Sequence, residues 1–553
     1  MISPKCTSDQ PSSWSSSGIR LKARSVSVYS TGYCKDANFL IIKQEGTSLR
    51  VSYTKVTVVE KQQVSRDTFF EKTVNTGTPA WPHLFDGPSY RISDAPKVHF
   101  IGIQEYVFCI LSEFVYFYYL CINHLRKEMI DERIILQVLA EQRDEIKGYD
   151  PSAWVSRREE DLFEFDSSLA QVVIGVRRSG KSTICHKVLL EHGIRYGYIN
   201  LDDDRLLGME AKDLNTVLSC VYQLYGTDIP YLFLDEIQDV DGWHLFVNRL
   251  LRSKMRIFVT GSNAKLLSSE LATHLTGRYN EIRLFPFSFS EYCSFHQIDT
   301  AGITTKAEAS RKSAFIDYIS TGGLPELQRL RNKRGYIESL INAILEKDIK
   351  RRYKIRNVEA LRKIAGHLIN NACQEINYEE MSEILGISDK TCKKYADYLR
   401  QAFLIQILTK HSFKSKNRIR NPKSYIVDPG FQDNRENSMA GENIGWRLEN
   451  VVYIELLRRC AYNFRDVYYY TADPRAKEVD FVVCNKDRAL ELIQVAYEID
   501  TPKSYNRETS ALIQAAGPLH CDNLTLIAFS PTRDVVIDGK TIHIISAIEW
   551  LLS

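Results

Sequence analysis

The residues best suited to chemistry lie in one glycine-rich stretch, residues 175–183 (GVRRSGKST). It fits the P-loop (Walker A) pattern G-x-x-x-x-G-K-[ST]. In that pattern glycines let backbone N–H groups approach phosphates, and the following helix adds partial positive charge. We expect Lys181 to reach the β- and γ-phosphates of ATP and Ser182 to bind Mg²⁺. The expected phosphate-binding residues are Gly175, Val176, Arg177, Arg178, Ser179, Gly180, Lys181, Ser182 and Thr183.

Two elements must hold this loop. An apolar strand is predicted at residues 171–174, directly before it. A helix is predicted over residues 183–191, with Gly193 as the stop signal just beyond it. A strand on one side and a helix on the other is the setting that such a loop requires.

A second apolar run, residues 231–234 (YLFL), is typical of a strand buried on both faces of a parallel sheet. It ends in Asp235 and Glu236. In a nucleotide site, Asp235 would hold the Mg²⁺ shell and Glu236 would orient the attacking water. The alternative is that these acids cap the next helix, a role that Asp239 also fits.

A third strand, residues 256–260, ends in Gly-Ser-Asn, and we expect this end to lie between the phosphate loop and the acid pair. Asn263 is therefore a candidate sensor of the γ-phosphate. The alternative is an N-cap for a helix beginning near Ala264. A further strand within residues 198–204 (YINLDDD) ends in three aspartates, which would face the nucleotide, a partner or solvent.

A helix, a tight turn and a second helix are predicted at residues 380–385, 386–388 and 389–403. Ser388 or Asp389 would be the N-cap. A hairpin should follow, and this region is rich in basic residues without an acid between Lys410 and Lys423. The candidate nucleic-acid contacts are Lys390, Lys393, Lys394, Lys414, Lys416, Arg418 and Arg420. Such a surface would grip DNA or RNA phosphates with salt-sensitive affinity, whereas the alternative is a protein-interaction module with solvated basic loops.

Six motifs occur in a characteristic order: GVRRSGKST, YINLDDDR, YLFLDEIQDVDGW, FVTGSNAKLL, LTGRYNEIRLFPFSFSEY and STGGLPEL. Together they resemble prokaryotic AAA-type ATPases that carry a C-terminal domain of unknown function related to restriction-endonuclease folds. The resemblance covers roughly residues 130–530. It implies an α/β fold: a P-loop NTPase domain of the AAA+ class with a parallel sheet, then a winged helix, then an α/β restriction-endonuclease-like domain.

The resemblance also implies a role for Arg278, which matches the family's Gly-Arg pair. An arginine there would contact the γ-phosphate of its own or a neighbouring subunit. The alternative is a salt bridge with Glu281.

The C-terminal pattern resembles a nuclease core whose metal site has eroded. Such cores need an Asp at one strand end, then an acid and a Lys two residues apart on the next strand. Asp480 matches the first position and Glu449 the helix acid, but Gln494 and Ala496 replace the acid and the Lys. We therefore expect a retained binding or scaffolding fold rather than nuclease activity.

Length and composition limit the number of domains and the class of protein. A chain of 553 residues predicts three to four domains, and 72 Lys+Arg against 69 Asp+Glu means that any basic surface must be local. The composition excludes collagen, a coiled coil and a wholly disordered chain. None of the 12 cysteines forms a CxxC pair, which favours reduced thiols in the cytoplasm over a secreted scaffold or a zinc ribbon.

The first 128 residues differ from the rest. They start Ser-rich without the features of a signal peptide, and they contain β-like runs at residues 39–42 and 56–59. Residues 106–122 are a short transmembrane candidate, but Glu113 at the centre costs about 2.5 kcal/mol or more, so no span is expected. An alternative is that translation naturally starts at Met129. The preceding Arg-Lys-Glu can be written with purine-only codons, like a ribosome-binding site.

The sequence thus predicts a leader at residues 1–128, an AAA-type ATPase domain at 129–320, a helical lid and winged helix at 321–430, and a degenerate nuclease-like domain at 431–553. The predicted function is ATP hydrolysis with Mg²⁺, acting as a nucleotide-dependent switch on nucleic acid or a protein partner. Two alternatives remain: an ATP-gated nuclease, and a nucleotide-dependent protein-interaction module without nucleic-acid binding. The partner and the oligomeric state stay open.

Overall fold

The fold was analysed in a computed structural model of the chain. It describes the backbone of residues 26–31, 36–45, 48–59 and 63–75, and backbone with side chains at 130–262, 275, 277–412, 421–433, 444–472 and 476–553. The chain divides into two compact units, Met1–Leu125 and Arg126–Ser553.

The first unit contains a four-stranded antiparallel sheet in the order β1-β2-β3-β4. Its strands are β1 (Val26–Thr31), β2 (Asp36–Glu45), β3 (Ser48–Val59) and β4 (Gln63–Asn75). The β-like runs at residues 39–42 and 56–59 lie in β2 and β3, as predicted. The transmembrane candidate at residues 106–122 and Met129 lie outside the described residues. Among the residues that are described, no helix is both long and apolar enough to cross a bilayer.

The second unit begins with a five-stranded sheet in which every pairing is parallel, in the order β6-β7-β8-β5-β9. The strands are β5 (Ala170–Ile174), β6 (Tyr196–Asn200), β7 (Tyr231–Asp235), β8 (Arg256–Gly261) and β9 (Tyr279–Arg283). Strand β5 lies between β8 and β9, while the next strand in sequence, β6, lies at the far edge. This reversal opens a crevice at the carboxyl ends of the strands, where ligands bind in open α/β sheets.

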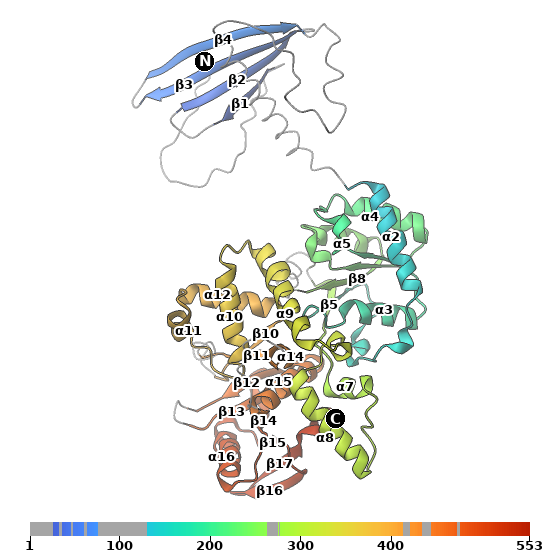
Figure 1. Cartoon of the computed structure of the whole chain (residues 1–553), viewed down its shortest axis with the longest axis vertical. Helices are drawn as coiled ribbons and strands as arrows, with labels where there is room; N and C mark the ends of the chain where they lie inside the picture. Colours follow the sequence, from blue (N-terminus) through green and yellow to red (C-terminus); the bar gives the residue numbers. More distant parts are fainter. Residues whose placement is uncertain are drawn as a thin grey trace. The chain divides into compact units, whose positions relative to one another are not determined.

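Helices cover both faces of this sheet (Figure 1). They are α2 (Glu132–Lys147), α3 (Lys181–Glu191), α4 (Leu214–Tyr225) and α5 (Trp243–Arg252). Alternate residues of one strand serve the two faces: Val172 and Ile174 share a core with residues of α2, α4 and α5, whereas Val173 packs with residues of α3. The strands are therefore apolar throughout, because neither face meets water.

A helical region follows the sheet. Its helices are α7 (Phe289–Phe295), α8 (Thr305–Thr321), α9 (Lys333–Ala343), a π-helical segment (Ile344–Arg351), α10 (Val358–Asn370), α11 (Tyr378–Leu385) and α12 (Asp389–Gln401). Helices α11 and α12 are joined through Gly386, whose φ of +65° permits the tight turn. The Ser388 side chain caps α12 by accepting from Thr391 N, so the predicted helix, turn and helix are confirmed.

A short antiparallel pair, β10 (Ile405–Leu408) with β11 (Lys423–Ile426), follows α12. The chain then forms α14 (Gly430–Asp433), α15 (Ile444–Asn463), α16 (Pro502–Leu519) and α17 (Ala547–Leu552) around a mixed sheet of order β12-β13-β14-β15-β17-β16. Its strands are β12 (Asp466–Tyr470), β13 (Val479–Asn485), β14 (Arg488–Ala496), β15 (Leu524–Ala528), β16 (Arg533–Ile537) and β17 (Lys540–Ser546). One hydrophobic core runs from α2 through the helical region to α15 and α17.

Candidate active site

The glycine-rich loop connects β5 to α3, as predicted. Helix α3 begins at Lys181, directly after Gly180, whose φ of +96° favours glycine. Gly175 is required for a different reason: a Cβ there would lie 2.1 Å from the carbonyl oxygen of Leu284. The Lys181 ammonium is buried and donates to the carbonyl of Val176 at 3.2 Å. The loop thus places a lysine and the N-terminus of an eleven-residue helix together, which suits a phosphate chain.

Asp235 ends β7 next to this loop. Its carboxylate accepts a hydrogen bond from Ser182 Oγ at 3.0 Å and one from the Tyr198 hydroxyl at 3.0 Å. The Thr260 hydroxyl donates to the same carboxylate. Burial, together with the negative charge of Glu236, raises the pKa of Asp235 to about 6. The two residues that the sequence assigned to the metal therefore lie side by side.

Glu236 has an unusual backbone for a non-glycine residue, with φ +52° and ψ +40°. Its N–H donates to Thr260 Oγ1 at 3.0 Å, and its Oε1 lies 3.8 Å from Lys181 Nζ. Gln238 donates to the other carboxylate oxygen. Strained backbone held by surrounding contacts is typical of functional positions.

Strand β8 lies between β5 and β7, as the sequence predicted. Asn263 lies outside the described residues, so its sensor role stays a prediction. Strand β8 brings Thr260 to the acid pair, and Ser262, directly after β8, accepts a hydrogen bond from Gln238 at 3.5 Å; sequence reasoning passed over both residues. A polar Thr as the last side chain of an apolar strand was the available signal.

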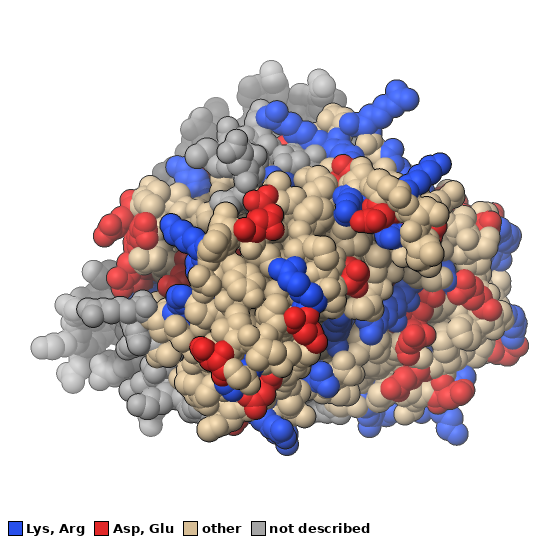
Figure 2. Space-filling view, turned by 90° about the horizontal axis from the view of Figure 1, so that it is seen from below, with Lys and Arg blue, Asp and Glu red and all other residues tan. Residues whose placement is uncertain are grey.

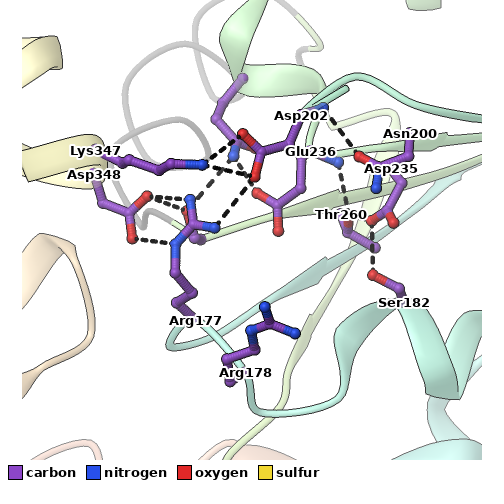
Figure 3. A network of polar contacts seen from close by, with 12 residues as sticks. Arg177, Arg178, Ser182, Asn200, Asp202, Asp235, Glu236, Thr260, Lys347 and Asp348 are labelled. Atoms are coloured by element: carbon purple, nitrogen blue, oxygen red, sulfur yellow. Dashed lines mark hydrogen bonds and ion pairs between the residues drawn. The ribbon is translucent and has the colours of Figure 1, made fainter. Parts of the chain in front are cut away.

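A network of charged side chains, formed by Arg177, Asp202, Lys347 and Asp348, lies beside the acid pair (Figure 3). Arg177 of the loop donates to Asp348 from Nε at 3.2 Å and from Nη2 at 2.9 Å, and from Nη1 to Asp202 at 3.4 Å. Lys347 lies 3.3 Å from Asp202. Of the three aspartates after β6, the first therefore faces the loop, whereas Asp203 pairs with Arg205. Nothing in the sequence marked Asp348, one of two acids in the basic stretch 346–356 (EKDIKRRYKIR).

Arg278 lies at the opposite end of the sheet from the loop. Its carbonyl accepts from the N–H of Ala170, the first residue of β5, whereas the loop follows the last residue of β5. Its side chain is exposed, and Glu281, the alternative partner, is bonded to Arg283 at 2.9 Å. Contact with the phosphates of its own subunit does not fit this placement, so only a neighbouring subunit's site remains as a proposed target.

The donor set of the site fits a magnesium nucleotide. Mg²⁺ prefers hard oxygen ligands, and the Ser182 hydroxyl and Asp235 carboxylate are such ligands. Lys181 is the cation suited to the phosphates, and Glu236, whose Oε1 lies 3.8 Å from Lys181 Nζ, is the acid beside them. Within the described residues, the buried Ser179 hydroxyl of the loop makes no hydrogen bond, which leaves a donor for an incoming oxygen.

The helix-turn-helix exposes part of the predicted basic surface. Lys390, Lys393 and Lys394 on α12 are exposed, at spacings that share one helical face. Lys393 lies over the ring of Tyr378 and Lys394 over that of Tyr398. Lys414, Lys416, Arg418 and Arg420 lie outside the described residues, so their role stays a prediction. On the face drawn in Figure 2, basic and acidic side chains are intermingled.

Lys423 does not belong to that surface, contrary to the predicted basic hairpin. It is 6% exposed, and its ammonium points into the C-terminal domain, 2.5 Å from Glu478 Oε1 and 3.8 Å from Glu449 Oε1. Burial and packing of β11 against α15 cause this placement, since the Tyr425 hydroxyl also donates to Glu449 at 2.7 Å. The last basic residue of the hairpin is thus an internal counterion.

The same cluster contains the residues compared above with a nuclease core. Asp480 on β13 is buried, and its carboxylate accepts from the N–H of Val495 at 2.8 Å. Gln494 donates to Glu508 at 2.8 Å. Burial and the charge of Glu449 raise the pKa of Asp480 well above its ordinary value. Among the described residues, no group of three or more His, Cys, Asp or Glu side chains is arranged to hold a metal ion.

Comparisons with known proteins agree with the order of these parts. Three family models match: an AAA domain at residues 167–293, a domain of unknown function (DUF8612) at 312–434, and a domain of unknown function (DUF4143) at 445–545. Among solved structures, a Walker-type ATPase of Pyrococcus abyssi is 13% identical with a TM-score of 0.32, covering 55% of this chain and 95% of that one.

Two relatives match this chain over nearly their whole length. An uncharacterized protein of Methanocaldococcus jannaschii is 30% identical over an alignment of 441 residues, which covers 77% of this chain and 97% of that protein. An uncharacterized protein of Haemophilus influenzae is 31% identical over 424 residues, 72% of this chain and 99% of that protein. The chain therefore belongs to the family of AAA-type P-loop ATPases that carry a C-terminal domain of unknown function (DUF4143).

Proposed function

We propose that this protein binds and hydrolyses Mg-ATP, and that its nucleotide state controls how the C-terminal domains act on nucleic acid or a protein partner. The observation that carries the first part is the convergence of Lys181, Ser182, Asp235 and Glu236 at the carboxyl ends of β5 and β7, the two strands that flank β8. They come from two loops separated by about fifty residues, and each has the chemistry that phosphoryl transfer needs.

In this proposal Lys181 and the backbone of the loop bind the phosphates, while Ser182 and Asp235 would hold Mg²⁺. The ion supplies charge neutralisation on the phosphate oxygens when bound. Glu236 orients the attacking water by accepting a hydrogen bond from it. Thr260 fixes both acids, because it donates to Asp235 and accepts from the N–H of Glu236. Arg278 is proposed to act on a neighbouring subunit's nucleotide and Asn263 as a γ-phosphate sensor.

The switch is supported by the connection from the loop to the helical region. Arg177 of the loop is bonded to Asp348 of the π-helical segment, which precedes α10, α11 and α12. A change at the phosphates therefore has a polar route to the segment that precedes the helix-turn-helix in the chain. The exposed lysines of α12 favour nucleic acid as the partner, through sequence-independent phosphate contacts.

The test is ATP turnover by the full chain, with and without DNA or RNA, at two salt concentrations. We expect turnover to be lost in Lys181→Ala and Glu236→Gln and kept in Lys306→Ala, a variant of an exposed lysine on α8. Nucleic acid should stimulate turnover at low salt, and Lys390→Ala/Lys394→Ala should weaken that stimulation. Equal turnover in wild type and Lys181→Ala would refute the proposed enzyme.

The alternatives give other outcomes. No nucleic-acid affinity even at low salt, with turnover intact, would favour a protein-interaction module. Mg²⁺-dependent cutting that is lost in Asp480→Ala would favour an ATP-gated nuclease. The second outcome is disfavoured by Gln494 and Ala496, which replace the acid and the Lys that such a nuclease core needs.

A further inference from the structure

Asp348 lies outside the parallel sheet but contacts two of its functional loops. Its carboxylate binds the Arg177 guanidinium through two hydrogen bonds, 3.2 and 2.9 Å long, and accepts from Ser262 Oγ at 3.0 Å. The Asp348 side chain is 5% exposed. A buried carboxylate of this kind depends on its partners, because removing one leaves an uncompensated charge.

The segment that carries Asp348 makes further contacts with the same site. Lys347 lies 3.3 Å from Asp202, and Arg352 donates to the carbonyl of Gln238 at 3.3 Å. The segment is π-helical over Ile344–Arg351, between α9 and the turn before α10. Such helical irregularities are rare and occur frequently at functional sites.

The Arg177 guanidinium thus binds two anionic side chains, those of Asp348 and Asp202. A guanidinium carries five N–H donors; in Arg177 the Nε–Nη2 edge binds Asp348 through two hydrogen bonds and Nη1 donates to Asp202, so a phosphate that takes the Nε–Nη2 edge must displace Asp348. In Figure 3, Asp348 and Asp202 both point to this guanidinium, and Glu236 lies beside it. A terminal phosphate bound at the loop therefore competes with Asp348 for the same donors.

We propose that Asp348 is a positioning residue that sets the preference of the site for ATP over ADP, by competing with the γ-phosphate for Arg177. This rests on the proposed function, in which the loop binds ATP. When a γ-phosphate takes the guanidinium, Asp348 loses its counterion and the segment 344–351 must move. The segment therefore moves when ATP binds and not when ADP binds, and this movement is passed on to α10 and the helix-turn-helix.

The first experiment measures the dissociation constants of unlabelled ATP and ADP by competition with a fluorescent nucleotide. Asp348→Asn keeps the shape and an acceptor for Ser262 but removes the charge, so ATP should gain about tenfold relative to ADP, the worth of one strong charged hydrogen bond. Asp348→Glu should stay within about twofold of wild type. The matched control is Glu346→Gln in the same segment, whose carboxylate pairs with Lys350.

The second experiment needs no variant. Hydrogen exchange of residues 344–352 in the wild-type chain should be at least several-fold faster with a non-hydrolysable ATP analogue than with ADP. Identical exchange, or an ATP-to-ADP ratio in Asp348→Asn equal to that in Glu346→Gln, overturns the inference while leaving the ATPase intact. Failure of wild type to bind ATP better than Lys181→Ala does would instead overturn the proposed function.

Discussion

Replacing Lys423 with Met tests whether the acid cluster of the C-terminal domain depends on an ammonium from the preceding hairpin. Methionine keeps the length and the apolar stem but removes the charge. Glu449, Glu478 and Asp480 would then face one another without the cation that lies among them. The packing of Lys423 over the ring of Tyr469, with Nζ 5.5 Å from the ring centroid, would also lose its cation–π part.

The structure sets the size of the effect. Removing one partner of a buried ion pair costs about 3–5 kcal/mol. The Glu478 side chain is 32% exposed and can regain water, so we expect the lower end, about 3 kcal/mol near pH 8. Burial already raises the pKa of Glu449 and of Asp480, so protonation can relieve the repulsion. The loss should therefore shrink as the pH falls towards 5.

The assay is hydrogen exchange of β11 and β13 in the full chain, which reports local opening. A loss of about 3 kcal/mol corresponds to roughly hundredfold faster exchange in these strands. The matched control is Lys540→Met, because its partner Asp522 is 85% exposed and the pair should contribute at most about 1 kcal/mol. The reasoning fails if Lys423→Met accelerates exchange no more than Lys540→Met does, or if its effect grows at acidic pH.

Three further predictions concern the ATPase domain. Thr260→Val removes a hydroxyl bonded to Asp235, so turnover should fall about tenfold and half-saturation should need more Mg²⁺. Gly175→Ala places a Cβ 2.1 Å from the Leu284 carbonyl, so nucleotide binding measured by titration should be lost. Burial lowers the pKa of His186 to about 3, so between about pH 6.5 and pH 3 the unfolded chain binds a proton that the folded one does not. Within that window stability should fall by about 1.4 kcal/mol for each pH unit, and His186→Gln should flatten that slope in thermal unfolding.

Controls separate these effects from general damage. Thr260→Ser keeps the hydroxyl and should restore most turnover. Gly148→Ala, where a Cβ meets its nearest neighbour at an ordinary 3.4 Å, should bind nucleotide as wild type does. Unchanged turnover in Thr260→Val, full binding in Gly175→Ala, or equal acid sensitivity of wild type and His186→Gln would each contradict the corresponding prediction.

Local sequence predicted most of the nucleotide site. The loop, its strand and its helix are contiguous, and the acid pair follows directly on an apolar run, so spacing alone placed Lys181, Ser182, Asp235 and Glu236. The helix boundaries were also close: α3 begins two residues before the predicted position and ends at the predicted Glu191. These features depend on hydrogen bonds and side-chain periodicity within single elements.

Contacts between distant segments were not predicted. Asp348 and Ser262 carry no local pattern that marks them, and the only signal at Thr260 is a polar side chain at the end of an apolar strand, yet all three lie around the acid pair. Arg278 matched a family motif, but the parallel pairing of β9 with β5 puts it at the amino end of the sheet. In the sequence, Lys423 had the same local pattern as the other basic residues of the predicted hairpin, but in the structure it contacts Glu449 and Glu478.

The sequence by itself determined where the candidate chemical groups lie: a glycine-rich loop between a strand and a helix, and two acids at the end of a buried strand, for which we propose metal binding and water orientation. It did so because each motif is short and its backbone geometry is set locally. Only the tertiary structure decided which charges face one another, because a lysine or an aspartate has the same local pattern whether it meets solvent or a buried partner. Burial then decides the outcome, as it makes Asp348 the partner of Arg177 and turns Lys423 from a surface cation into an internal one.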